Sequence, residues 1–348
     1  MSRAQSRVRA VVLAAGLGVR LRPLTDFAPK PLLPVAGVPI LGHTLARLAE
    51  IGCEAVAVNL HYLPEAIRGR FGERFGDLPI TWSVEPEILG TLGALAPLRD
   101  FLRPAELVLL INGDSFCRWP LRRLLRRHRA SGADSTLLLT RRADPARFGG
   151  GVGIDGGGRV VSLRAGGVAT DPAERRFVFA GAHVFAPALV AGVEARRSDI
   201  VSDLYEPMLA AGRPIAALLT SRSWHDLGTP ERYLEGVLET VRGGWPRRLL
   251  PRSWVAPEAR LGARVRVRDS AVEADVQVAA GTRVERSVLL PGTRVGEGCT
   301  LCEAVVGYGA ELPPGSWVER RVVTPRLAGA PPAPDGSAVG GVVYTPLS

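Results

Sequence analysis

A fixed spacing of aliphatic residues near the end of this 348-residue chain constrains its fold more than any other feature. Four triplets of Val or Leu start 17 residues apart, with successive steps of six, six and five residues. Small, Gly and polar residues fill the positions between them. A repeat of this kind predicts units that bury their apolar side chains only by stacking on their neighbours. The triplets are Val255, Leu261 and Val267; Val272, Val278 and Val284; Leu289, Val295 and Leu301; and Val306, Leu312 and Val318.

The six-residue step resembles the hexapeptide repeat of a left-handed parallel β-helix, in which triangular coils stack their aliphatic corner residues into one core. We therefore expect a short left-handed β-helix over residues 254–322. An irregular Val-rich β-domain is the alternative. The last segment, 323–348, is a tail rich in Pro, Gly and Ala, and we expect it to be poorly ordered from Leu327 onward.

The first 242 residues show a different pattern, in which short apolar runs alternate with amphipathic helical segments. This pattern predicts an α/β domain with a Rossmann-like, mostly parallel sheet flanked by helices, whose ligands bind at the carboxyl ends of the strands. Residues 243–253 form the linker to the repeats, and residues 149–161 form a Gly-rich hairpin that turns at Asp155 and Gly156. The expected strands are Ala10–Ala14, Ala55–Leu60, Ile80–Val84, Leu107–Ile111, Ser135–Thr140, Phe177–Phe185 and Ile215–Leu219.

The composition limits the classes of function. The net charge is +10, but Arg residues are spread through the whole chain, which indicates a solvated surface rather than a track for nucleic acid. No apolar run approaches the roughly 20 residues that span a bilayer, and the start lacks the pattern of a signal peptide. We therefore expect a cytoplasmic protein that contacts neither membrane nor nucleic acid. Its four cysteines, Cys53, Cys117, Cys299 and Cys302, are expected to be packing residues.

Lys30 is the single lysine among 44 basic residues. A chain that uses Arg almost everywhere keeps an ammonium where a compact charge must reach one crowded oxygen. Lys30 is for this reason a candidate catalytic residue.

The segment after the first strand, LAAGLGVRLRPLT, contains two glycines that allow a close approach of the backbone to a phosphate. The dinucleotide fingerprint fails, because Leu21 occupies its third glycine position, and no P-loop lysine follows. Arg20 and Lys30 follow instead, ten residues apart. Two cations on a loop after the first strand suit a triphosphate.

These residues carry a specific resemblance. LAAGLGVRLRPLT and PKPLLPV, followed in order by EPEILGTLGAL, INGDS, FAGAHVF and WHDLGTPERY, are similar to the signature of the sugar nucleotidyltransferases, which join a nucleoside triphosphate to a sugar 1-phosphate. The resemblance implies transfer of a nucleoside monophosphate, with release of pyrophosphate. It also implies site residues: Arg20 and Lys30 as catalytic cations; Ala15, Gly16, Gly18, Glu85 and Gly90 as nucleotide contacts; and Gly181 as a sugar-site residue.

Two carboxylates are candidates for a metal site. Asp114 follows an apolar strand, and Asp226 lies just before a helix that is expected to begin at Pro230 with Thr229 as its cap. Two carboxylates together with phosphates are the usual ligands of Mg²⁺. Turn or capping roles are the alternative for both residues.

One segment departs from the family pattern. Many members carry Glu-Lys-Pro before the strand that corresponds to FAGAHVF, and its lysine binds the sugar phosphate. This chain has VSLRAGG there, so Arg164 is our candidate replacement.

Several functional alternatives remain open at this stage. GTP with mannose 1-phosphate is the first choice of substrates; UTP or dTTP with a glucose-type or N-acetylmuramic acid 1-phosphate is the second. A catalytically silent regulatory or scaffolding subunit is the alternative of another class. Acyl transfer by the repeats is disfavoured, because all five histidines precede them. Stacked coils with an exposed end also predict a homo-oligomer.

Overall fold

The computed structural model of the chain describes residues 7–163, 174–243, 252–327, 337–339 and 341–347. The chain divides into two compact units. The first unit consists of Met1–Leu17 and Leu41–Trp224, and the second of Gly18–Ile40 and His225–Ser348. The chain therefore leaves the first unit directly after the first strand, returns to it at Leu41, and leaves it again after Trp224.

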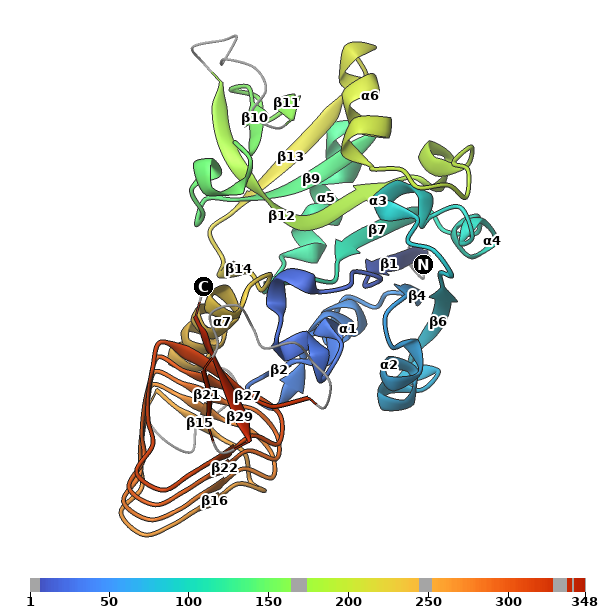
Figure 1. Ribbon diagram of the computed structural model, residues 1–348. Coiled ribbons are helices and arrows are strands. Elements are labelled where there is room, and N and C mark those ends of the chain that lie inside the picture. The colour runs from blue at the N-terminus through green and yellow to red at the C-terminus, as the bar shows by residue number, and fades with distance from the viewer. Residues whose placement is uncertain (1–6, 164–173, 244–251, 328–336, 340, 348) are drawn as a thin grey trace, which may run out of the picture. The chain divides into compact units, whose positions relative to one another are not determined.

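The first unit is built on a sheet that has ten strands within the described residues (Figure 1). Strands β1, β4, β6 and β7 are parallel, whereas β12 runs antiparallel to both of its long neighbours, β7 and β9. The expected mostly parallel sheet is confirmed, and no end of an expected strand differs from the structure by more than two residues. The spatial order is β11 (Val160–Leu163), β10 (Val152–Ile154), β12 (Arg175–Phe185), β7 (Leu107–Asn112), β1 (Val8–Leu13), β4 (Ala55–Leu60), β6 (Leu78–Val84) and β5 (Arg74–Phe75), with β9 (Ser135–Thr140) and β13 (Ile215–Thr220) joined through β12.

Both faces of this sheet are covered. Val11 packs in one apolar cluster with residues of α3, α4 and α6, while its neighbours Ala10 and Val12 point to the opposite face and are fully buried as well. Strands buried on both faces read as continuous apolar runs, which explains the sequence pattern. The helices are α1 (Ile40–Glu50), α2 (Pro64–Phe71), α3 (Gly90–Gly93), α4 (Arg99–Leu102), α5 (Leu121–Ser131) and α6 (Glu206–Ala210), with short 3₁₀ or π turns at Pro145–Phe148, Pro187–Val190 and Val201–Tyr205 and a short strand β8 (Ser115–Cys117).

The Gly-rich segment forms the expected hairpin. Strands β10 and β11 pair antiparallel, and Asp155 accepts a hydrogen bond from the backbone N–H of Gly158 at the turn.

The second unit contains the repeat, whose coils stack in parallel (Figure 1). Each of the three predicted aliphatic columns is one ladder of parallel strands with the register the 17-residue period requires. Val255 pairs with Val272, and Val272 pairs with Leu289. In the other two columns, too, each residue pairs with the residue 17 positions along the chain. The predicted β-helix is thus confirmed, and the residues of the three columns belong to one core or pack against it, except Leu261, which is exposed. The ladders are β15 (Trp254–Val255), β18 (Ala271–Val272), β21 (Val288–Leu289), β24 (Val305–Val306) and β27 (Arg321–Pro325); β16 (Arg260–Leu261), β19 (Gln277–Val278), β22 (Arg294–Val295) and β25 (Glu311–Leu312); and β17 (Arg266–Arg268), β20 (Arg283–Glu285), β23 (Thr300–Cys302) and β26 (Trp317–Glu319).

The second unit also holds the helix α7 (Pro230–Arg242) and the hairpin of β2 (Pro34–Val35) and β3 (Val38–Pro39). Helix α7 begins at Pro230 as expected, and the side chain of Thr229 accepts a hydrogen bond from the backbone N–H of Arg232. Three 3₁₀ turns precede the hairpin: η1 (Val19–Leu21), η2 (Leu24–Asp26) and η3 (Lys30–Leu32). Strand β14 (Trp224–Asp226) contains the boundary between the units.

The expectation of a poorly ordered tail is wrong for part of the last segment. Strand β29 (Val342–Pro346) pairs antiparallel with β27, and β28 (Ser337–Val339) pairs with β29. The β27 ladder otherwise ends with unpaired backbone groups, and β29 satisfies them while Val342 joins the core of the coils. The composition of the tail is dominated by residues 328–336, which lie outside the described residues.

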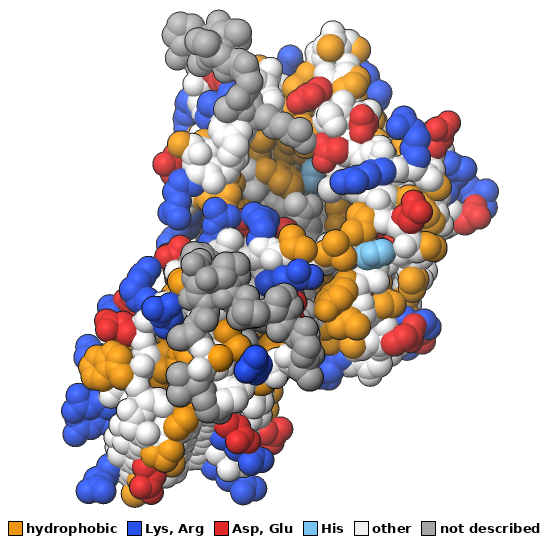
Figure 2. Space-filling view, viewed as in Figure 1, with side chains coloured by type: hydrophobic (Ala, Val, Ile, Leu, Met, Phe, Trp, Pro, Cys, Tyr) orange, Lys and Arg blue, Asp and Glu red, His pale blue; other side chains and the backbone are white. Residues whose placement is uncertain are grey.

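One face of the molecule shows the expected mixture of charges. On the face shown in Figure 2, Lys and Arg side chains are interspersed with acidic ones. Among the described residues, no helix has both the length and the apolar character needed to cross a membrane.

Candidate active site

Several of the predicted site residues follow the carboxyl ends of neighbouring parallel strands in the first unit. Ala15 and Gly16 follow β1, Glu85 follows β6, and Asp114 lies two residues after β7. Strand β1 lies between β4 and β7, so the order of the strands reverses beside it. Ligands of open α/β sheets bind at such a switch point, outside the carboxyl ends of the strands.

A chain of buried hydrogen bonds fixes the loop after β1. Asn59, at the end of β4, accepts a bond of 2.7 Å at Oδ1 from the backbone N–H of Ala14. Its Nδ2 donates to Oε1 of Glu85 over 2.8 Å, and Oε2 of Glu85 accepts from the backbone N–H of Leu89 over 3.0 Å. Glu85 is only 3% exposed, so both of its oxygens bind protein groups. Its carboxylate thereby connects the loop after β1 to the loop after β6.

The predicted glycines of this unit differ in what surrounds them. Gly16 is exposed, and a Cβ added there would meet no protein atom within 4 Å. Gly90 has φ +79°, and an added Cβ would lie 2.4 Å from the carbonyl oxygen of Ser198. Gly181, in β12, has φ +78°, and its Cβ would lie 2.6 Å from Oγ of Ser115. The fold therefore requires glycine at Gly90 and Gly181, whereas at Gly16 the space stays open for a ligand.

The carboxylate Asp114 is half-buried in the turn between β7 and β8. The preceding residue, Gly113, lies against β1, because its backbone N–H donates to the carbonyl oxygen of Leu13 over 2.8 Å. Cys117, at the end of β8, is buried, and burial raises the pKa of its thiol to about 12. Cys117 is therefore a packing residue and not a nucleophile.

The second unit carries Gly18, Arg20 and Asp226. Gly18 has φ +66°, and its carbonyl oxygen accepts from Oγ1 of Thr25 over 2.9 Å, which closes the turn that presents Arg20. A Cβ added at Gly228 would lie 2.7 Å from Oδ1 of Asp226 and 3.0 Å from Nη2 of Arg20. Arg20 and Asp226 thus lie next to each other beside this glycine.

Asp226 also has a basic partner that the sequence analysis did not single out. Oδ2 of Asp226 lies 2.5 Å from Nη1 of Arg232, one turn into α7, and the side chain of Asp226 is 15% exposed. A cluster of cationic side chains around one carboxylate suits a site that receives negative charge, since phosphate oxygens can then join or replace the carboxylate as partners.

Lys30 lies half-buried in η3, and its backbone is well anchored. Its carbonyl oxygen accepts from the backbone N–H of Leu33 over 3.1 Å, and the carbonyl oxygen of Leu33 accepts from Ile40 over 3.0 Å. Pro29 and Pro31 flank Lys30 and restrict the backbone further. Arg164 lies outside the described residues.

Comparison with known proteins identifies the family. A family model described as "Nucleotidyl transferase" matches residues 9–242, about two thirds of the chain. The chain belongs to the nucleotidyl transferase family. A second model, described as "GlmU-like, C-terminal hexapeptide", matches residues 251–320.

Relatives of this nucleotidyl transferase span most of its length. It is 34% identical, over 306 residues, to the mannose-1-phosphate guanylyltransferase of Mycobacterium tuberculosis. The aligned region covers 86% of this chain and 84% of that relative. It is 29% identical over 336 residues to the mannose-1-phosphate guanylyltransferase catalytic subunit beta of Danio rerio. This aligned region covers 91% of this chain and 90% of that relative. The crystal structure of HddC from Yersinia pseudotuberculosis has the same fold, with a TM-score of 0.57 at 21% identity over 66% of this chain and 98% of that chain.

Two residues that sequence reasoning missed lie beside predicted site residues. Asn59 and Arg232 contact predicted site residues directly. A signal for Asn59 was present, because a polar residue near the end of the apolar run AVAVNL is costly to bury without a specific partner. Arg232 gave no such signal, since one more Arg on a helix of an Arg-rich chain is unremarkable in sequence.

Proposed function

We propose that this nucleotidyl transferase transfers guanosine monophosphate from GTP to mannose 1-phosphate, giving GDP-mannose and pyrophosphate. The observation that carries the proposal is the 34% identity to a mannose-1-phosphate guanylyltransferase over 86% of the chain. UTP or dTTP with a glucose-type or N-acetylmuramic acid 1-phosphate is the alternative substrate pair, and a catalytically silent subunit is the alternative of another class.

The loop after β1 is the proposed site for the nucleotide. Backbone amides at Ala15, Gly16 and Gly18 would bind phosphate oxygens, and the open space at Gly16 leaves room for them. Gly90 would approach the base. Glu85 would act by holding the two loops in place, because both of its oxygens already accept hydrogen bonds.

The two cations of the second unit are proposed to act on the phosphates. Arg20 would bind the β- and γ-phosphates with its planar guanidinium, which stabilises the charge of the leaving pyrophosphate. Lys30 would neutralise charge at the α-phosphate, where a compact ammonium fits better than a fork. Gly181 and Arg164 are the proposed contacts of the sugar phosphate.

A divalent cation, Mg²⁺, is proposed to bind Asp114 and Asp226. No cluster of three or more His, Cys, Asp or Glu side chains suited to a metal occurs in the part of the chain that the structure describes. Two hard carboxylates and the phosphates of the substrate fit Mg²⁺, which rarely binds in a cage made of protein alone. When bound, the metal draws charge from the phosphoryl oxygens.

The reaction makes and breaks one bond at the α-phosphorus. An oxygen of the sugar 1-phosphate attacks it, the bond from the α-phosphorus to the bridging oxygen of the β-phosphate breaks, and pyrophosphate leaves with the electron pair. Positioning and charge stabilisation supply the catalysis of such a transfer, and these are the roles proposed for Arg20, Lys30 and the two aspartates.

Pyrophosphate release tests the proposal. Purified protein would be assayed with Mg²⁺ against the four common nucleoside triphosphates and a panel of hexose 1-phosphates. We expect release with GTP and mannose 1-phosphate, and a loss of at least about 100-fold in kcat for Lys30→Ala, the size typical of removing one group that stabilises transition-state charge. Release confined to another pair would reassign the substrates. Nucleotide binding without release for any pair would favour the silent subunit.

Two further parts of the proposal concern the cellular compartment and the oligomeric state. We propose the cytoplasm as its compartment, supported by four cysteines that are all unpaired thiols. We also propose a homo-oligomer, supported by the exposed first coil of the β-helix, where Leu261 is 37% exposed. Light scattering of the purified protein would measure the mass.

A further inference from the structure

A carboxylate is buried in the β-helix without a cationic partner among the described residues. Glu273 directly follows β18 and is 1% exposed. Its oxygens Oε1 and Oε2 lie 3.2 and 2.9 Å from the backbone nitrogen of Gly37, which donates to them. Burial of a carboxylate without a cation is expensive, so a role beyond packing is expected for this side chain.

The partner of Glu273 is the tip of the β2–β3 hairpin. Ala36 and Gly37 form the turn with φ of 51° and 82°. A Cβ at Gly37 would lie 2.7 Å from Cζ2 of Trp254, so the indole closes the other side of the tip. Trp254 and Glu273 belong to the first two coils, and the β-helix therefore holds this turn by one packing contact and by the hydrogen bonding of one backbone N–H to both carboxyl oxygens.

The base of the same hairpin leads to Lys30. The hydroxyl of Tyr233, on α7, donates to the carbonyl oxygen of Pro34. Leu33 connects the hairpin to η3 through two backbone hydrogen bonds. Its N–H donates to the carbonyl oxygen of Lys30, and its own carbonyl oxygen accepts from the N–H of Ile40. Only three residues separate Lys30 from Pro34, so a displacement of the hairpin displaces Lys30.

We infer that Glu273 is a positioning residue for nucleotidyl transfer: the β-helix holds the hairpin at Gly37 through this carboxylate and so sets the position of Lys30. The inference rests on the catalytic role proposed for Lys30. It gives the β-helix a part in catalysis without any chemistry of its own.

The charge of Glu273 changes near neutral pH. Burial raises the pKa of its carboxyl to about 7, against the opposing effect of the hydrogen bond from Gly37. The titratable groups near it are the phenols of Tyr233 on α7 and Tyr308 on the coils, and burial raises the pKa of both well above the neutral range. Glu273 is therefore the group here that titrates near neutral pH. Because the buried environment favours the neutral form of this carboxyl, the closed hairpin is most stable when Glu273 is protonated, and the contact with Gly37 weakens as pH rises through 7.

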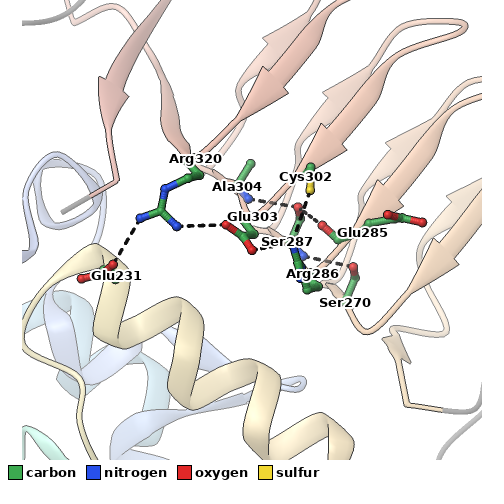
Figure 3. Close-up of polar contacts among 9 residues, drawn as sticks. All are labelled: Glu231, Ser270, Glu285, Arg286, Ser287, Cys302, Glu303, Ala304 and Arg320. Carbon is green, nitrogen blue, oxygen red and sulfur yellow. Dashed lines mark hydrogen bonds and ion pairs between the residues drawn. The ribbon is translucent and has the colours of Figure 1, made fainter.

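Three full-length variants test the inference. Glu273→Leu removes the acceptor, and Glu273→Gln keeps a neutral acceptor of the same shape. Arg320→Ala is the matched control, because Arg320 also joins the β-helix to α7, through Glu231 at 3.5 Å, but does so in solvent. Figure 3 shows this contact, in which Arg320 reaches from the coils toward the helix.

The first readout is amide hydrogen exchange of residues 30–40, which needs no substrate. We expect at least about tenfold faster exchange in Glu273→Leu and no change in Arg320→Ala. The second readout is kcat, expected to fall about 10- to 100-fold in Glu273→Leu with KM for both substrates changed far less, because displacement of a catalytic group by about 1 Å has effects of this size. Glu273→Gln should recover most of kcat and lose the decline of the wild type above pH 7.

The outcomes separate the inference from the proposed function. Exchange and kcat of a folded Glu273→Leu equal to those of the wild type would overturn the inference alone. If Glu273→Leu does not fold, a decline of kcat above pH 7 that is identical in the wild type and Glu273→Gln overturns the inference. A wild type that releases no pyrophosphate refutes the proposed function, and the exchange of residues 30–40 still decides whether Glu273 holds the hairpin.

Discussion

At the scale of single residues, two glycines of the nucleotide loops distinguish a requirement of the fold from a requirement of the ligand. We predict that Gly90→Ala lowers the free energy of unfolding by more than about 1–2 kcal/mol, because φ at Gly90 is +79° and the new Cβ would collide with the carbonyl oxygen of Ser198. Gly16→Ala should leave stability unchanged and raise KM for the nucleoside triphosphate. Thermal unfolding and steady-state kinetics of both variants check this pair. A Gly16→Ala protein with normal KM would show that the phosphates do not approach this residue.

The buried hydrogen bonds around Glu85 support a second prediction. In Glu85→Gln the new amide can accept from only one of the two donors, Asn59 Nδ2 and the N–H of Leu89, and its own NH₂ group faces the other. The expected cost is about 1–3 kcal/mol of stability, the usual cost of an unsatisfied buried donor. Because Asn59 holds Ala14, KM for the nucleotide should also rise. Glu87→Gln, exposed on the same loop, is the control and should change neither quantity.

At the scale of elements, one corner of the β-helix carries a column of charges with alternating sign. Arg252, Asp269, Arg286, Glu303 and Arg320 are 17 residues apart, and all have φ between 44° and 59°. Arg252 pairs with Asp269 at 2.8 Å. Glu303 pairs with Arg286 at 2.5 Å and with Arg320 at 3.0 Å, and Figure 3 shows these three side chains. A left-handed backbone disfavours residues with a Cβ, so this corner combines a local strain with compensating charge contacts.

Two substitutions at Glu303 separate these effects. Glu303→Gln keeps the strain and removes both ion pairs, so the melting temperature should fall, and by less at high salt because the pairs are partly exposed. Glu303→Gly removes the pairs and the strain, so it should be about 1 kcal/mol more stable than Glu303→Gln. Calorimetry at low and high salt measures both differences. Equal stability of the two variants would mean that the corner holds no strain.

The elements themselves were largely predictable, because each depends on a short-range pattern. The 17-residue period determined the register of the ladders, and the apolar runs located the strands of the sheet. The antiparallel direction of β12 had no local signal, since a buried run reads the same in either direction. The order of β29 also escaped prediction, because it depends on the exposed edge of β27 and not on its own composition.

The site was predictable only where its residues belong to a motif. Arg20, Lys30, Asp114 and Asp226 stand in characteristic segments, and their roles stay proposals. Asn59, Arg232 and Glu273 act through partners 26, 6 and 236 residues away in the sequence. Contacts over such separations are set by the fold, so a pattern within one segment does not contain them.

At the scale of the whole molecule, the path of the chain assigns the first motif to both units. Gly16 belongs to the first stretch of the sheet unit, which ends at Leu17, while Gly18, Arg20 and Lys30 belong to the unit that contains the β-helix. The catalytic cations proposed here therefore fold together with the coils, α7 and the β2–β3 hairpin. Changes in the β-helix are for this reason expected to reach the reaction through the stability of this unit as well as through direct contacts.

The pH dependence of stability provides a test at this scale. The carboxyl of Glu273 has a pKa of about 7 in the folded chain against an ordinary value of 4.5, so between these values the folded state binds more protons than the unfolded state. Its stabilising contribution is therefore complete below pH 4.5 and is lost as pH rises through 7. A shift of this size corresponds to at most about 3 kcal/mol.

Glu273→Gln carries no charge at any pH, so its stability should exceed that of the wild type at pH 8 and nearly equal it at pH 5. Glu311→Gln, at an exposed position of another ladder, should follow the wild type at both values. Thermal unfolding of the three proteins at the two pH values measures the effect. A difference between Glu273→Gln and the wild type that does not change with pH would show that the carboxyl of Glu273 keeps one charge state across the neutral range, and any decline of kcat above pH 7 would then have to come from another group.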